Sequence, residues 1–111
     1  LVMINIIGGG PAGLFTAYNL LKRGIDAKVY EKDLELGSPL HCTGIVSNKT
    51  IKLFEESKEI TINKLYGVKV IVGDRIYKAL SSTPKAFMID RVRFENNLGH
   101  KILDLGGEII L

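Results

Sequence analysis

Hydrophobic and polar positions in the first third of the chain follow a pattern that predicts a strand, a helix and a second strand. The apolar run Val2–Ile7 is typical of a strand buried on both faces of a parallel sheet. Pro11 stands where a helix begins, a position that needs no backbone donor. Ala27–Tyr30 predicts the next strand. Between these two strands, a helix that ends at Gly24 is predicted by apolar side chains at helical spacing: Leu14, Ala17, Tyr18 and Leu21.

The middle of the chain predicts a helix followed by short strands. Ser47 is a good N-cap, and we expect a helix from Ser47 to about Ser57. β-branched residues fill Leu65–Val72 and Arg75–Leu80, and the Gly73–Asp74 pair between them favours a tight hairpin turn. Phe87–Ile89 predicts a third short strand.

The last segment predicts one more helix and the beginning of a strand. Asp90 caps the helix, and its apolar face ends before Gly106–Gly107. That face consists of Phe94, Leu98, Ile102 and Leu105. The sequence then stops within the apolar run Glu108–Leu111. We therefore expect residues 1–111 to form one incomplete domain, the N-terminal part of a longer protein, with a β-hairpin insertion at about 62–89.

Composition and charge limit the classes of function. Fifteen basic and twelve acidic residues give a net charge of +3, and the basic residues are scattered. Because there is no basic run or aromatic-interleaved stripe, we expect no nucleic-acid partner. The single cysteine excludes a disulfide framework and a cysteine-based zinc site, and we predict no metal site. No apolar stretch reaches the ~18 residues of a membrane span, so we expect a cytoplasmic protein.

The glycine-rich turn after the first strand carries the clearest chemical signal. Gly8, Gly10 and Gly13 form a G-x-G-x-x-G motif between the strand and the helix. The first glycine allows the tight turn, the second lets a pyrophosphate approach the backbone, and the third permits close packing of helix on strand. Backbone donors at the helix start, around Pro11 and Ala12, would hold the phosphate charge. The sequence thus predicts an α/β, Rossmann-like dinucleotide-binding fold.

Glu31 directly follows the second predicted strand. A carboxylate at that position accepts hydrogen bonds from the adenosine ribose of a dinucleotide. The turn itself does not decide between FAD and NAD. The alternative interpretation is a glycine-rich turn without a binding role.

Four stretches resemble known flavoproteins. GGGPAG and VYEK resemble the FAD-binding start of flavoprotein oxidoreductases, while SPLHCTGIVS and FMIDRVRFENNL resemble the geranylgeranyl reductase family. That family, within the p-hydroxybenzoate hydroxylase-like flavoproteins, has a P-x-x-C-x-G-I/L-x-S stretch and later an (I/L)-D-R-x-x-F-(D/E)-x-x-L helix start. The matching positions here are Pro39, Cys42, Gly44, Ile45 and Ser47, then Ile89, Asp90, Arg91, Phe94, Glu95 and Leu98. The cysteine loop is the discriminating part of a resemblance that covers nearly the whole chain.

The resemblance implies FAD as the cofactor and gives roles to single residues. The three glycines of the turn would bind the FAD pyrophosphate and Glu31 the adenosine ribose. Lys32 would lie along the adenine side. Arg91 would open a helix beside the pyrophosphate and the ribityl chain, where a guanidinium can fork onto oxygens. The alternative for Arg91 is a plain surface or salt-bridge residue.

The resemblance also implies a place for the cysteine loop. Cys42 and Gly44 would approach the isoalloxazine ring and the substrate alkene, and Cys42 is expected to act in catalysis, as a proton donor or by positioning one. The alternative is that Cys42 only packs as a small apolar residue. His41 is expected to pack or hydrogen-bond in the loop, and His100 to be solvated.

As a function, the resemblance implies an FAD-dependent reductase of isoprenoid carbon–carbon double bonds, with a lipid substrate and peripheral contact with the membrane. Two alternatives stay open: a monooxygenase of the same fold, and a non-catalytic dinucleotide-binding module completed by a partner chain. The family's remaining flavin contacts lie downstream of this chain. We therefore expect the chain alone to bind FAD weakly or not at all, with an oligomer or a further C-terminal chain as partner.

Overall fold

The computed structural model describes residues 2–33, 35–36 and 42–111, which form two compact units. The first unit comprises Leu1–His41 and Arg91–Leu111, and the second comprises Cys42–Asp90. Two residues named from the sequence, Pro39 and His41, lie outside the described residues. The prediction of a single domain with an insertion at 62–89 stays a prediction.

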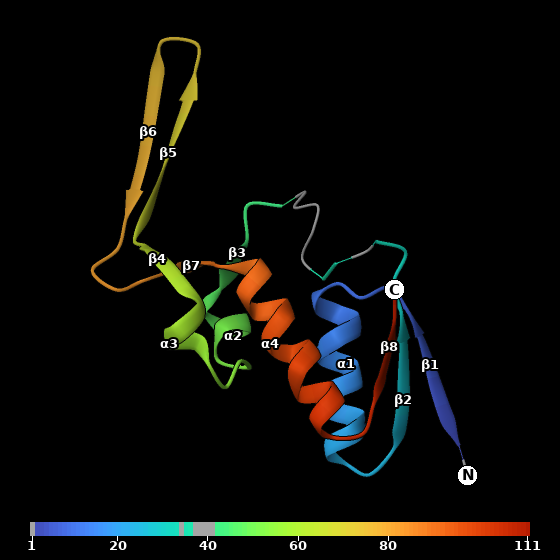
Figure 1. Cartoon of the computed structure of the whole chain (residues 1–111). Helices are drawn as coiled ribbons and strands as arrows, with labels where there is room; N and C mark the ends of the chain where they lie inside the picture. The colour runs from blue at the N-terminus through green and yellow to red at the C-terminus, as the bar shows by residue number, and fades with distance from the viewer. Residues whose placement is uncertain (1, 34, 37–41) are drawn as a thin grey trace. The chain divides into compact units, whose positions relative to one another are not determined.

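The first unit is a three-stranded parallel sheet covered by two helices (Figure 1). The strand order is β1–β2–β8, and α1 packs against β2 and α4. These elements are β1 (Met3–Ile7), α1 (Pro11–Lys22), β2 (Asp26–Tyr30), α4 (Arg91–Asp104) and β8 (Glu108–Ile110). The predicted β–α–β unit, the last helix and the final strand are confirmed, and with them the Rossmann-like fold.

The core of the first unit lies where the two helices meet the middle strand. Leu14 of α1, Val29 of β2 and Ile102 of α4 are fully buried. Removing such a side chain from water stabilises the fold by about 1.5–3 kcal/mol. The other buried apolar residues of this unit are Ala17, Leu21, Ala27, Phe94 and Leu98. These buried positions follow the helical and strand periods seen in the sequence.

Strand β1 differs from its prediction. A strand buried on both faces was expected, but Met3 is exposed and Ile7 is 83% exposed. Within the described chain β1 is an edge strand, hydrogen-bonded only to β2. Ile6 points toward α1, since a side chain placed on Gly13 would meet it. By strand alternation Met3 and Ile7 therefore share the opposite face, which neither helix covers.

The second unit contains a small antiparallel sheet and a separate hairpin. The sheet has the order β3–β7–β4, and the hairpin pairs β5 with β6. Two short helices accompany the sheet. The elements are β3 (Ile45–Ser47), α2 (Asn48–Ile51), α3 (Ser57–Ile60), β4 (Thr61–Leu65), β5 (Gly67–Val72), β6 (Arg75–Leu80) and β7 (Ala86–Ile89).

The hairpin and the third strand are confirmed, whereas the helix expected from Ser47 to Ser57 is wrong in length. Ser47 does cap a helix, because its hydroxyl accepts a hydrogen bond from the Thr50 amide at 3.2 Å. The helix nevertheless ends at Ile51. The next amides, of Leu53 and Phe54, bond three residues back, the tighter pattern that closes a helix.

No helix among the described residues is long and apolar enough to cross a membrane.

Candidate functional site

The glycine turn connects β1 to α1 in the first unit, and its backbone is held against the neighbouring strand. The Gly8 amide donates to the carbonyl oxygen of Tyr30 at 2.7 Å, and Gly8 adopts a positive φ of 105°. Gly10 is the N-cap of α1, and no side chain caps this end of the helix. Since Pro11 has no N–H, the first donors that α1 can offer a ligand are those of Ala12 and Gly13.

The last two glycines of the motif differ in the space around them. A Cβ on Gly13 would lie 2.0 Å from the carbonyl oxygen of Gly8, so only glycine lets α1 pack this closely on the turn. A Cβ on Gly10 would meet nothing within 4 Å. The backbone at Gly10 therefore borders open space, as a pyrophosphate-binding turn requires.

Glu31 lies against this turn. Its Oε2 accepts a hydrogen bond from the Gly9 amide at 2.6 Å, and its Oε1 accepts one from the Asp33 amide at 3.0 Å. The N–H groups of Asp33 and Gly9 hold the pKa of the Glu31 carboxyl below its ordinary value of 4.5. The carboxylate thus stays ionised at neutral pH, and its remaining lone pairs can accept ribose hydroxyls.

Gly9 also belongs to the site, because its amide binds Glu31, and the sequence interpretation missed it. A Cβ at this position would lie 3.1 Å from side-chain atoms of Glu31 and of Leu36, so a larger residue would press on the carboxylate that Gly9 binds. The run of three glycines was the available signal. The Rossmann motif assigns roles to its outer members only, which is why the middle one was passed over.

Arg91 opens α4 in the same unit. Its Nη2 donates to the Glu95 carboxylate at 2.5 Å, one helical turn along, and Glu95 is only 2% exposed. The side chain of Arg91 is 21% exposed. The buried carboxylate of Glu95 therefore holds the Arg91 guanidinium in position. Sequence reasoning did not anticipate this role, because glutamates are rarely buried. Contact between Arg91 and a cofactor stays a prediction, as does a place for the exposed Lys32 beside adenine.

Cys42 and Gly44 belong to the second unit. Cys42 is exposed, and its Sγ accepts a hydrogen bond from the Gly44 amide at 3.5 Å. Gly44 has a positive φ of 78°, and its carbonyl accepts from the Ile89 amide at 2.9 Å, which joins the loop to β7. The catalytic role of Cys42 and the flavin contact of Gly44 stay predictions.

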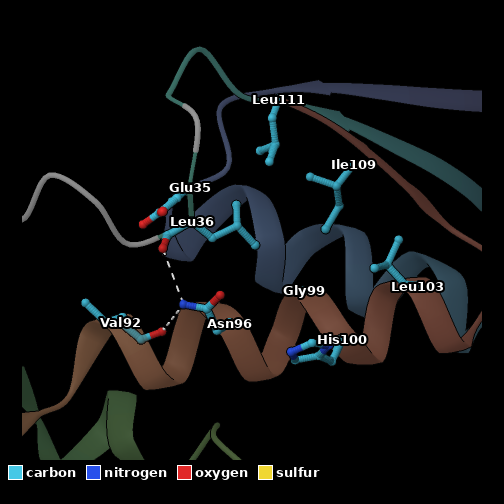
Figure 2. Close-up of a pocket in the computed structure, with 9 residues that line it drawn as sticks. All are labelled: Glu35, Leu36, Val92, Asn96, Gly99, His100, Leu103, Ile109 and Leu111. Carbon is cyan, nitrogen blue, oxygen red and sulfur yellow. Dashed lines mark hydrogen bonds between the residues drawn. The ribbon is translucent and has the colours of Figure 1, made fainter.

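A groove of about 380 Å³ in the first unit runs between α4, β8 and the segment after β2 (Figure 2). Asn96 fixes one wall of the groove, because its side-chain amide donates to the backbone carbonyl oxygens of Leu36 at 3.3 Å and of Val92 at 2.8 Å. Leu103, Ile109 and Leu111 make the lining mostly apolar, and the exposed His100 lies at its border. The groove suits a hydrophobic contact better than an anion.

A parallel sheet, a glycine turn at a helix N-terminus and a carboxylate bound to that turn define a dinucleotide-binding domain. Residues 6–87 match the family described as NAD(P)-binding Rossmann-like domain, and the chain belongs to it.

Among curated proteins, the chain is 25% identical to digeranylgeranylglycerophospholipid reductase of Methanosarcina acetivorans, over 94% of this chain and 27% of that protein. The chain thus spans about a quarter of that relative's length. Among solved structures, a geranylgeranyl bacteriochlorophyll reductase-like protein from Thermoplasma acidophilum superposes with a TM-score of 0.75. The identity is 21%, over 97% of this chain and 30% of the other. The predicted resemblance to geranylgeranyl reductases is confirmed.

The same fold occurs in proteins of other activities. Aklavinone-11 hydroxylase, in a ternary complex with FAD and aklavinone, superposes with a TM-score of 0.68 at 20% identity, over 97% of this chain and 25% of the hydroxylase. A likeness at this level shows the shared fold and does not distinguish one reaction from another.

Proposed function

We propose that this chain is the FAD-binding part of a reductase that reduces carbon–carbon double bonds of isoprenoid lipids. The observation that carries the dinucleotide site is the hydrogen bond between the Gly9 amide and Glu31, beside open space at Gly10. The likeness to a digeranylgeranylglycerophospholipid reductase over nearly the whole chain favours an isoprenoid lipid as substrate.

The residues present fit the diphosphate and ribose of FAD. The amides of Ala12 and Gly13 would donate to the pyrophosphate, and Gly10 would let it approach the backbone. Glu31 would accept the ribose hydroxyls while it repels a 2′-phosphate. Arg91, held by Glu95, would present its guanidinium to phosphate or ribityl oxygens.

Bound flavin would supply the hydride for the double bond. In this proposal the protein provides position, a water-poor pocket and the proton that the other alkene carbon takes up. Cys42 would hold or orient that proton, and the hydrogen bond from the Gly44 amide would steady its sulfur. A lipid substrate would also bring the protein into peripheral contact with a membrane.

A flavin-dependent monooxygenase is the second candidate, favoured by the fold shared with aklavinone-11 hydroxylase. A dinucleotide-binding module without catalysis is the third. The three differ in what the protein consumes. A reductase saturates a prenyl lipid without taking up oxygen, a monooxygenase consumes oxygen with its substrate, and a module does neither.

The test uses the complete protein that carries this chain. A flavin absorption band in the purified protein, together with saturation of geranylgeranyl lipid under anaerobic conditions by a chemical reductant, is the expected result. The matched variants are Cys42→Ala, expected to keep the flavin and lower turnover, and Gly10→Ala, expected to lose the flavin. A colourless protein that binds NAD would contradict the proposal.

A further inference from the structure

A second pocket, of about 470 Å³, lies in the second unit and shares no residue with the nucleotide site. It is bounded by α2, α3 and the β4–β7 pair. The polar part of its lining includes Asn48 and Thr61, and the apolar part includes Ile51 and Phe87. Its lining therefore contains both polar and apolar side chains.

Three lysines from three different elements line this pocket: Lys52 at the end of α2, Lys58 in α3 and Lys64 in β4. Among the residues that the structure describes, no acidic one lines it. Within the described part of the chain, none of the three ammonium groups takes part in a salt bridge. Three like charges around one cavity repel each other, and an anion bound between them would remove that repulsion.

The acidic residues of the same segment lie outside the lining of the pocket. Glu55, Glu56 and Glu59 do not line it. The lysines therefore face the cavity without a carboxylate on its wall.

A β-bulge brings the polar groups of β4 to the same side. In β4 the pairing with β7 shifts between Thr61, which faces Ile89, and Asn63, which faces Met88. In a regular strand Thr61 and Lys64, an odd number of positions apart, would point to opposite faces. The extra residue, Ile62, restores them to one face. Bulges of this kind often occur next to functional sites, where they re-aim a side chain.

Hydrogen bonds hold the wall of the pocket in place. The side-chain amide of Asn48 donates to the Pro84 carbonyl at 2.8 Å, and the hydroxyl of Thr61 donates to the Ser57 carbonyl at 2.5 Å. Asn48 and Thr61 are thus held in place before any ligand arrives, whereas the three lysines are exposed.

We propose that this pocket binds the phosphate group of a phosphoester. Three ammonium groups suit an anion with several acceptor oxygens, and the apolar lining residues Ile51 and Phe87 would accommodate the carbon chain that the phosphate carries. The proposal rests on this pocket alone and stands whether or not the chain belongs to a lipid reductase.

The experiment titrates the 111-residue chain with sodium phosphate and with glycerol 3-phosphate at constant ionic strength, followed by amide NMR. A second arm measures co-sedimentation with phosphatidylglycerol vesicles, compared with neutral phosphatidylcholine vesicles. The test variant is Lys58→Gln with Lys64→Gln. The matched control is Lys49→Gln, an exposed lysine of α2 that does not line the pocket.

Saturable shifts at the lining residues, weakened at least about tenfold in the double variant and less than about twofold in the control, are expected. Binding in the first arm alone indicates a soluble phosphoester, and vesicle binding lost in the double variant indicates a lipid headgroup. If Lys49→Gln weakened phosphate binding as much as the double variant, the binding would reflect general surface charge, and the proposal would be overturned. An absence of shifts at the lining together with equal sedimentation on both vesicles would also overturn it.

Discussion

The glycine turn of the first unit and the β5–β6 hairpin of the second are both built on glycine, yet they lie in opposite environments. Gly13 is enclosed by backbone, with the Gly8 carbonyl where a Cβ would be. Gly73, at the hairpin turn with a φ of 60°, borders open space, and all residues of both hairpin strands are exposed. The glycine turn of the first unit is therefore specified by packing within that unit, and the turn at Gly73 by local turn chemistry.

This contrast separates what the two units require of their residues. In the first unit a single atom added at the turn must displace backbone. In the hairpin, Val70 and Tyr77 face each other across the strands with about half of each side chain in solvent. An isolated two-stranded hairpin is marginally stable in water, so this part of the fold depends least on the packing of the rest.

The largest expected effect is that of Gly13→Ala. The added methyl group would overlap the Gly8 carbonyl, and we expect a loss of at least about 3 kcal/mol in the free energy of unfolding. Gly10→Ala is the matched control, because its methyl group enters open space and should change stability by less than about 1 kcal/mol. Urea unfolding followed by circular dichroism measures both. Equal stability of the two variants would mean that the helix does not pack on the turn as described.

Valine-to-threonine changes compare the two units directly. Val29→Thr buries a hydroxyl at a fully buried position of β2 and should cost about 1–3 kcal/mol. Val70→Thr places the same hydroxyl at a position that is 47% exposed and should cost less than about 0.5 kcal/mol. Urea unfolding measures both changes. A larger loss of stability for Val70→Thr than for Val29→Thr would show that the hairpin is covered in solution.

Glu31→Gln should lower stability by about 1 kcal/mol near neutral pH, because a charge-assisted hydrogen bond from Gly9 becomes a neutral one. The folded state lowers the pKa of Glu31, so its contribution is complete above the ordinary pKa of 4.5 and disappears as the pH falls through the folded-state pKa. The difference between wild type and variant should therefore shrink below about pH 4.5. A difference independent of pH would contradict the assigned ionisation.

The smallest effect on stability is expected for Cys42→Ala. The thiol is exposed and accepts one long hydrogen bond from Gly44, so the change should stay within about 0.5 kcal/mol. Thermal unfolding measures it. A loss of several kcal/mol in the free energy of unfolding would mean that Cys42 contributes to packing, which is the alternative to a catalytic role.

Much of the first unit could be predicted from the sequence because its signals are local. The glycine spacing, the proline at the helix start and the acidic residue after the second strand lie within one short segment, and the structure brings Glu31 to the turn as expected. The exposure of β1 could not be predicted, because an apolar strand reads the same whether or not its outer face is covered.

The second unit was less accessible to sequence reasoning for a different reason. β3 contains only three residues and β4 is interrupted by a bulge at Ile62, so neither shows a regular alternation. The pairing of β7 with both strands joins distant segments of the chain. In the first unit, the burial of Glu95 was not predicted either, because it depends on an ion pair with Arg91 that periodicity does not reveal.

The central claim, that the turn and Glu31 form a dinucleotide site, is tested most directly by titrating FAD into the isotope-labelled chain while its amide resonances are observed. The account predicts saturable shifts of the amide resonances of Gly9, Ala12 and Gly13. The binding should be weak, with a dissociation constant above micromolar, and the shifts should be lost in Gly10→Ala. Shifts confined to other parts of the chain, or unchanged binding in Gly10→Ala, would contradict it.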